Sequence, residues 1–132
     1  MIKNKKKKGS DAERELVHYF WKNEWAAVRV AGSGSMRYPS PDLLVGKNGI
    51  LYAIECKITE KERQYFEQKE IDELRQFAKI MSGIALIAVK FKKQPWKFYP
   101  LSKLSKTEKQ YVIKHTEIGI NEEYLLKSSK PL

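Results

Sequence analysis

Two carboxylates and a lysine stand in this sequence in an order suited to phosphodiester chemistry. Asp42 follows Pro41, and the next polar signature along the chain is Glu55-Cys56-Lys57. Carboxylate oxygens are the ligands that hard divalent cations such as Mg²⁺ prefer. A lysine beside them would orient an attacking water or offset the negative charge that develops on a phosphate. We therefore predict a metal-dependent nuclease site at Asp42, Glu55 and Lys57.

A hairpin of two strands would bring these groups together. Segments 42–45 and 50–58 are predicted as strands, and the Asn-Gly turn between them makes the strands antiparallel neighbours. That pairing would place Asp42 beside Glu55. Because successive side chains of a strand point to opposite faces, Glu55 and Lys57 share one face while Cys56 points to the core. The alternative interpretation is a solvent-facing charge pair on an edge strand.

The remaining pattern predicts an α/β fold with a mixed central sheet flanked by helices. Helices are expected where apolar residues recur every three or four positions, and strands where apolar residues run continuously. The expected helices cover 10–22, 71–81 and 121–126, the further strands cover 25–30, 84–89 and 96–99, and 59–67 is expected to be a loop. A chain of 132 residues suits one hydrophobic core, so we expect a single domain over 1–132.

The composition favours an anionic partner. The chain holds 26 Lys+Arg against 16 Asp+Glu, a formal net charge of +10, which suits nucleic acid or a membrane surface. Its apolar segments are shorter than the ~20 residues of a membrane span, so no membrane partner is expected. A single cysteine, Cys56, excludes an intrachain disulfide and a cysteine-based zinc site, and is typical of a reducing compartment.

Three further segments have a functional and a structural interpretation. Residues 1–9 carry Lys3 and Lys5–Lys8, either as a flexible basic arm that contacts phosphates or as a solubilising tail. Glu13 lies three residues after Ser10, so it is either a third acidic metal ligand or part of a helix capping box. The loop Gly32-Ser33-Gly34-Ser35 either lets the backbone approach a phosphate or is a flexible connector.

Taken in order, these motifs resemble the archaeal Holliday junction resolvases of the PD-(D/E)xK nuclease superfamily. The matching residues are Lys8-Gly9-Ser10, Glu13-Arg14-Glu15-Leu16, Val28 to Ser35, Pro41-Asp42 and Ile54-Glu55-Cys56-Lys57. The match runs from about Lys5 to Tyr99, and the C-terminal third matches loosely. The resemblance implies a restriction-endonuclease-like core and a homodimer. It also implies that Mg²⁺ or Mn²⁺ supports paired, symmetric nicks in four-way junction DNA.

The resemblance also implies a role for individual residues. It makes Glu13, Asp42 and Glu55 the acidic metal-binding residues, Lys57 the catalytic lysine and Ser33 the catalytic serine of the loop. The DNA-binding residues expected from the resemblance and the basic arm are Lys5, Lys6, Lys7, Lys8, Arg14, Arg29, Ser33, Gly34, Ser35 and Arg37. The family often has a glutamine early in the second helix, where this chain offers Gln68 and, at the aligned position, Glu70.

A junction-cutting enzyme would be cytoplasmic and associated with the nucleoid. The resemblance identifies no recombination or replication-clamp protein as a partner. Apolar residues expected at the dimer surface are Ile71, Leu74, Phe77, Trp96 and Phe98, whose alternative place is the core of one subunit. Two other functions fit the same sequence. One is a different nuclease of this superfamily that acts on duplex nucleic acid, and the other is a basic DNA-binding protein without catalysis.

Overall fold

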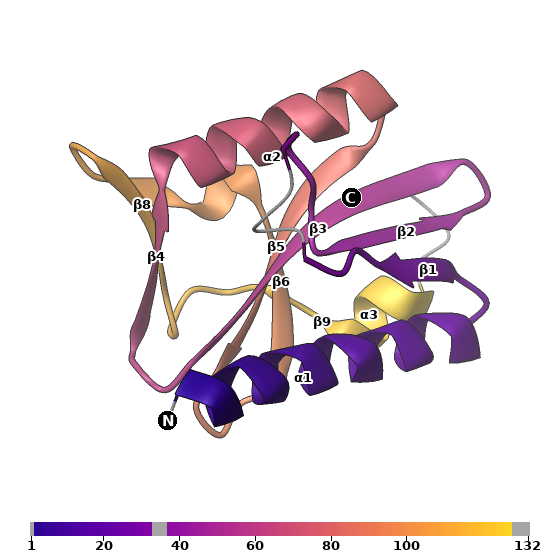
Figure 1. The fold of residues 1–132 in the computed structure, drawn as a ribbon, viewed down its shortest axis with the longest axis horizontal. Coiled ribbons are helices and arrows are strands. Elements are labelled where there is room, and N and C mark those ends of the chain that lie inside the picture. Colours follow the sequence, from indigo (N-terminus) through magenta and orange to yellow (C-terminus); the bar gives the residue numbers. More distant parts are fainter. Residues whose placement is uncertain (1, 33–36, 128–132) are drawn as a thin grey trace.

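The structure, a computed structural model, describes residues 2–32 and 37–127, with side chains from Lys8 onward (Figure 1). Two long helices, one short helix and nine strands make up these residues. In chain order they are α1 (Ile2–Lys22), β1 (Ala26–Arg29), β2 (Leu43–Lys47), β3 (Ile50–Thr59), β4 (Arg63–Glu67), α2 (Gln68–Met81), β5 (Ile84–Phe91), β6 (Trp96–Pro100), β7 (Ser105–Lys106), β8 (Gln110–Lys114), β9 (Ile120–Asn121) and α3 (Glu122–Lys127), with a 3-10 turn at Leu101–Lys103.

A six-stranded mixed sheet forms the centre of the molecule, in the order β1-β2-β3-β5-β6-β9. Strands β3 and β5 are parallel neighbours, and the other pairs in this sheet are antiparallel. From Leu86 to Val89, β5 is buried at every position, as its continuous apolar sequence predicts for a central strand covered on both faces. The predicted α/β fold with a mixed central sheet is confirmed.

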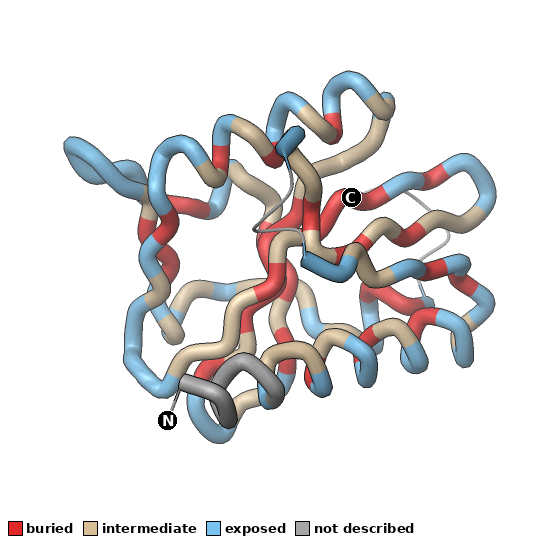
Figure 2. The backbone as a smooth tube through the Cα atoms, viewed as in Figure 1, coloured by how far each residue is buried: buried red, intermediate tan, exposed pale blue. Residues whose placement is uncertain are grey.

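Each face of this sheet is covered by its own apolar layer. Ala12, Leu16 and Phe20 of α1 pack with Leu125 and Leu126 of α3 against one face. On the other face, residues of α2 pack together with residues of a second, three-stranded sheet of order β4-β8-β7. Figure 1 shows α1 and α3 on one side and α2 on the other, and Figure 2 shows the buried positions along the strands between them.

The β2–β3 hairpin forms as its sequence predicts. Asn48 and Gly49 both have positive φ values, 51° and 83°, which a tight two-residue turn requires. The turn sets the antiparallel register in which Leu43 faces Ile54. The Asp42 backbone N–H donates a hydrogen bond of 3.0 Å to the Ile54 carbonyl, so Asp42 lies directly beside the strand that carries Glu55.

Helix α1 is longer than the sequence predicts. The predicted start at Ser10 is wrong, because the helix begins at Ile2 and passes through Gly9 and Ser10 without interruption. Lysine has a high helix propensity, so the lysine run extends the helix. A Cβ atom added at Gly9 would meet no atom within 4 Å, so this glycine marks no close approach that would end the helix. The mobility of residues 1–9 and the single-domain assignment stay predictions.

The loop predicted at 59–67 is wrong over its second half. Strand β4 pairs antiparallel with β8, whose residues lie far along the chain, and Phe66 of β4 is fully buried in the core shared with α2. Local pattern gives little sign of such a strand, because only Phe66 of its five residues is buried. This second sheet matters for function, because β4 leads directly into α2.

The apolar residues expected at a dimer surface fill the core of the subunit instead. Ile71 and Phe98 are fully buried, Leu74 and Trp96 nearly so, and Phe77 is partly buried against the core. That prediction is wrong, since an apolar pattern in a helix or strand marks a covered face without showing what covers it. Among the described residues no helix is long and apolar enough to cross a membrane.

Candidate active site

Strand β3 presents its acidic residue and its lysine on one face, as the alternation predicts. Glu55 and Lys57 point into a hollow of ≈510 Å³ that Glu13 and Asp42 also line. Ile54 and Cys56 point to the opposite face and are buried in the core with α1. The structure therefore brings together the four residues that the sequence singled out.

Backbone contacts hold the Asp42 carboxylate in place. Its Oδ2 accepts a hydrogen bond of 2.8 Å from the Cys56 backbone N–H, one residue from Glu55. Because this donor belongs to the strand itself, the carboxylate is fixed relative to Glu55 and Lys57. Asp42 also follows the buried Pro41 and precedes fully buried Leu43, so its backbone has little freedom.

Glu55 has the most perturbed carboxyl of the site. Burial, the negative charge of Asp42 and a hydrogen bond with Asp42 raise the pKa of Glu55 to about 8, although the positive charge of Lys57 opposes the shift. Two carboxyls at hydrogen-bond distance share a proton when no cation lies between them. Burial and the same negative charges raise the pKa of the Cys56 thiol, which keeps this cysteine neutral and unreactive.

Lys57 faces both the strand's acidic residues and α2. Its Nζ donates a hydrogen bond of 3.0 Å to Glu70 Oε1, and it lies 6.0 Å from the centre of the Phe66 ring. Burial alone would lower the pKa of Lys57, but the hydrogen bond and charge of Glu70, with the charges of Glu55 and Asp42, raise it above the ordinary value. The ammonium group is therefore fully charged at neutral pH.

Glu13 binds Arg29 rather than capping a helix. Arg29 Nε donates to Glu13 Oε1 at 2.9 Å, and Arg29 Nη2 donates to Ser10 Oγ at 2.9 Å. The capping-box interpretation of Ser10 and Glu13 is wrong, because both residues lie well inside α1. Burial and the charge of Asp42 raise the pKa of Glu13, while Arg29 and Arg14 lower it.

The acidic residues suit a hard divalent cation. The charge of Asp42 raises the pKa of both Glu13 and Glu55, so Asp42 repels each glutamate when both are ionised, and a cation would relieve that repulsion. No three acidic, histidine or cysteine side chains in the described part of the chain are arranged to enclose a metal on their own. Mg²⁺ usually takes one or two carboxylates and completes its shell with water and phosphate, so Asp42 and Glu55 fit it.

The predicted DNA-binding residues have different surroundings. Arg29 is partly buried against Glu13, whereas Arg37 is exposed at the edge of the hollow, 5.6 Å from the Tyr38 ring centre. Exposed Arg14 forms an ion pair of 3.3 Å with Asp11. Lys5, Lys6 and Lys7 lie on helix α1, but their side chains, like all of Ser33, Gly34 and Ser35, are outside the described residues.

Glutamates at the end of β4 and in α2 also belong to the site, and the sequence analysis named only Glu70 among them, as the residue aligned with the family's glutamine. Glu67, Glu70 and Glu73 line the hollow, and Glu70 contacts Lys57 directly. Of the two residues considered in this helix, Gln68 is exposed and Glu70 is half-buried. The sequence signal for Glu70 is weak, because its approach to β3 depends on strand β4 and its distant partner β8.

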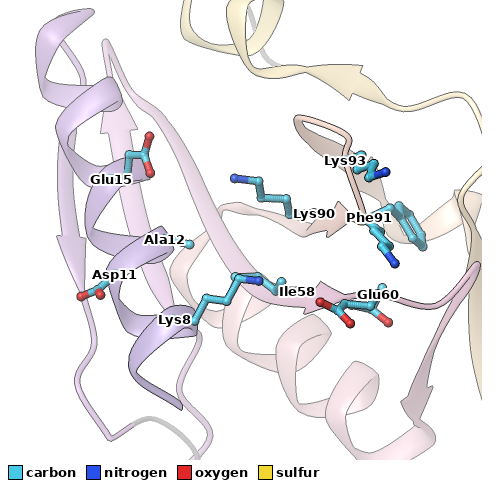
Figure 3. Close-up of a pocket in the computed structure, with 11 residues that line it drawn as sticks. Lys8, Asp11, Ala12, Glu15, Ile58, Glu60, Lys90, Phe91 and Lys93 are labelled. Carbon is cyan, nitrogen blue, oxygen red and sulfur yellow. The ribbon is translucent and has the colours of Figure 1, made fainter. Parts of the chain in front are cut away.

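A larger hollow of ≈660 Å³ lies between α1 and the ends of β3 and β5 (Figure 3). Its charged lining residues are of mixed sign: Lys8, Lys90, Lys92, Lys93, Asp11, Glu15 and Glu60. None of the predicted catalytic residues lines it, and its carboxylates are interspersed with lysines. The smaller hollow, which contains Glu13 and Glu55 with their raised pKa values, is therefore the candidate active site.

Comparison with known proteins places this geometry in a family. The family described as archaeal Holliday junction resolvase, Hjc, matches residues 4–131. This chain belongs to the Hjc family. The match includes Glu13, Asp42, Glu55 and Lys57, and it extends well beyond the segment over which the sequence motifs resemble the family.

Individual relatives agree with the family assignment. The crossover junction endodeoxyribonuclease Hjc of Archaeoglobus fulgidus is 37% identical over 108 residues, which cover 82% of this chain and 79% of that protein. The crossover junction endodeoxyribonuclease Hje of Sulfolobus acidocaldarius is 38% identical over 103 residues, which cover 76% of this chain and 74% of that protein. The crossover junction endodeoxyribonuclease Hjc of Methanocaldococcus jannaschii is 34% identical over 112 residues, which cover 85% of this chain and 80% of that protein.

A solved structure agrees as well. The structure of Archaeoglobus fulgidus Hjc, described as a Holliday junction resolvase from an archaeal hyperthermophile, superposes with a TM-score of 0.80 at 33% identity. The superposition covers 85% of this chain and 93% of that one. The predicted resolvase family, nuclease fold and enzyme class are confirmed. Members of such a nuclease family use a divalent metal ion.

Proposed function

We propose that this chain, as a homodimer, resolves four-way DNA junctions by paired symmetric nicks, with Mg²⁺ as its metal and Mn²⁺ as a substitute. The observation that carries the proposal is the convergence of Asp42, Glu55 and Lys57 in one hollow, in a chain of the Hjc family. A non-catalytic DNA-binding protein would have no use for a buried carboxyl whose pKa is raised to about 8.

The four central residues of the hollow each have a part in the proposed hydrolysis. Asp42 and Glu55 would hold the metal, with Glu13 as the further acidic residue. When bound, the metal polarises the scissile phosphate and lowers the pKa of a water molecule. Lys57 Nζ, charged and hydrogen-bonded to Glu70 in the same hollow, would orient the attacking water or stabilise the negative charge of the transition state. Ser33 would contact the phosphate.

Basic residues around the hollow bind the DNA backbone. Arg37 lies at its edge, Arg14 is exposed on α1 nearby, and Arg29 is held by Glu13. Lys5–Lys8, Gly34 and Ser35 would add further phosphate contacts along the junction arms. Contacts of this kind with phosphates are independent of sequence, so they would supply affinity and leave the choice of substrate to the shape of the junction.

Paired cuts require two sites. One chain presents one such hollow, and a four-way junction must be nicked on two strands of opposite arms to give two linear duplexes. A two-fold dimer matches the symmetry of that substrate. We propose that the enzyme acts in the cytoplasm, on the nucleoid. The dimer surface is to be sought among exposed apolar residues such as Trp21 and Val28, because the residues first expected there are buried.

Substitution of the acidic pair tests this function. Asp42→Asn and Glu55→Gln should each abolish junction cleavage with Mg²⁺ while leaving junction affinity within about threefold, because affinity comes mainly from Lys and Arg contacts with phosphate. Glu123→Gln is the matched control, because Glu123 is exposed on α3 and pairs only with Lys127 among the described residues. Cleavage by either acidic-site variant at the rate of the unaltered enzyme would refute the site assignment.

A further inference from the structure

Glu70 ties the lysine of the active site to the first turn of helix α2. Its Oε1 accepts a hydrogen bond of 3.0 Å from Lys57 Nζ. Its Oε2 accepts a second hydrogen bond of 3.0 Å, from the backbone N–H of Glu67 at the start of the helix. Both oxygens of one carboxylate are thus engaged, one with β3 and one with the backbone of α2.

This arrangement restricts a side chain that is otherwise flexible. Lysine carries its charge on a four-carbon stem with three donors and no fixed geometry. Within the described residues, Glu70 is the one carboxylate that forms an ion pair with Lys57, and the Phe66 ring lies 6.0 Å from the ammonium nitrogen. With one hydrogen bond and one aromatic ring to contact, the ammonium group is held on the side of the hollow that α2 forms.

Helix α2 is a rigid support for this contact. Ile71 and Leu74, in the first two turns of α2, are buried in the core that also contains Ala53 of β3. The side chains of Lys57 and Glu70 are only 31% and 32% exposed, so their contact is partly shielded from water. The position of the ammonium group is therefore set by the packing of α2 on β3.

We propose that Glu70 is a positioning residue, which fixes Lys57 Nζ at the active-site carboxylates by accepting its hydrogen bond at the reach of a glutamate side chain. The inference rests on the proposed catalytic role of Lys57. Because Glu70 acts through reach and hydrogen bonding, a side chain of the same length with an acceptor should replace it. A shorter side chain that keeps the charge should not.

Four variants separate position from charge. Glu70→Gln keeps the length and one acceptor oxygen, Glu70→Asp keeps the charge but is one methylene shorter, and Glu70→Met keeps the length without an acceptor. Asp72→Asn is the matched control, since Asp72 lies in the same helix turn and pairs with exposed Arg75 at 3.2 Å. Single-turnover cleavage of a junction, junction affinity and melting temperature are measured for each.

Two of the variants should change the rate of junction cleavage without changing the affinity for the junction. Misplacing a catalytic group by about 1 Å costs up to about 100-fold in rate, so Glu70→Asp and Glu70→Met should cleave at least about tenfold more slowly with unchanged junction affinity. Glu70→Gln and Asp72→Asn should cleave within about threefold of the unaltered enzyme. A fast Glu70→Asp with a slow Glu70→Gln would show that charge matters rather than position, and would overturn the inference.

A spectroscopic measurement reads the position of Lys57 without catalysis. In protein labelled with ¹⁵N-lysine, the ammonium resonance of Lys57 is identified by its loss in Lys57→Met. A hydrogen bond to Glu70 should slow its proton exchange and separate it from the exposed lysines. That separation should persist in Glu70→Gln and disappear in Glu70→Met. A Lys57 resonance that is the same in all variants would overturn the inference even if one variant folded poorly.

The outcome for Lys57 itself separates this inference from the proposed function. If Lys57→Met cleaves the junction normally, the proposed catalytic role of Lys57 is wrong. If Lys57→Met is inactive while Glu70→Met and Glu70→Asp cleave normally, the proposed function stands and the positioning role of Glu70 is refuted. A fall in melting temperature without a change in cleavage rate would mean that Glu70 only stabilises the start of α2, which also refutes it.

Discussion

At pH 7 the Glu55 carboxyl of the metal-free protein should be mostly protonated. Its pKa is raised to about 8 by burial and by the neighbouring Asp42. A group with that pKa is only about one-tenth ionised at pH 7 and about one-hundredth at pH 6. A divalent metal binds the ionised carboxylate, so each metal ion bound near neutral pH must displace one proton from Glu55.

The pH dependence of Mg²⁺ affinity follows from the release of one proton by Glu55 for each ion bound. The Mg²⁺ association constant should rise about tenfold from pH 6 to 7, about fivefold from pH 7 to 8 and about twofold from pH 8 to 9. The increase should level off above about pH 8.5. A carboxyl with the ordinary pKa of 4.5 would instead give no pH dependence in this range, because it would already be ionised.

Two assays measure this effect independently. The ¹³C resonance of the Glu55 carboxyl carbon in metal-free protein should titrate with a midpoint near pH 8. Calorimetric titration with Mg²⁺ between pH 6 and 9 should show the rising affinity and the release of a proton, and Glu55→Gln should remove both. A Glu55 midpoint below pH 5.5, or a Mg²⁺ affinity that is constant from pH 6 to 8, would refute the account of this carboxyl pair.

Three further predictions concern stability, Glu13 and the basic start of the chain. The raised pKa of Glu55 stabilises the metal-free protein most below pH 4.5, and this contribution should disappear as the pH rises through about 8. Melting curves of the metal-free protein should show this loss of stability, and Mg²⁺ should reverse it. The Glu55→Gln variant should not show the loss. Glu13→Gln should remove cleavage with little change in melting temperature, since an amide oxygen still accepts the hydrogen bond from Arg29; an active variant would make Glu13 a purely structural residue. Deleting residues 2–7 removes four lysines and should lower the salt dependence of junction binding by up to about 3.6 in log K against log [salt], at about 0.9 per lost phosphate contact; an unchanged slope would mean that the segment does not contact DNA.

The parts of the site that the sequence predicts are those set by local geometry. Asn48 and Gly49 fix the hairpin turn, and the alternation of β3 then places Glu55 and Lys57 on one face. The register of the hairpin follows from the turn, so Asp42 falls beside Glu55 without further information. Three of the four central residues therefore follow from the sixteen consecutive positions Asp42 to Lys57.

The parts that the sequence does not predict depend on contacts between distant segments. Strand β4 exists because β8 pairs with it, and β4 sets where α2 begins and hence where Glu70 meets Lys57. Glu13 illustrates the same limit, because its capping pattern is local whereas its actual partner, Arg29, lies on strand β1. The apolar face of α2 was equally ambiguous, since Ile71 suits a dimer surface as well as the core that it actually fills.

The most direct test of the central proposal compares a four-way junction with a linear duplex of the same sequence. We predict that the dimeric protein with Mg²⁺ places nicks at symmetry-related positions on two opposing strands of the junction, leaves the duplex intact, and cuts nothing when the metal is chelated. Equal cutting of the linear duplex, or nicks confined to one strand of the junction by a monomer, would contradict the account and favour a general nicking nuclease.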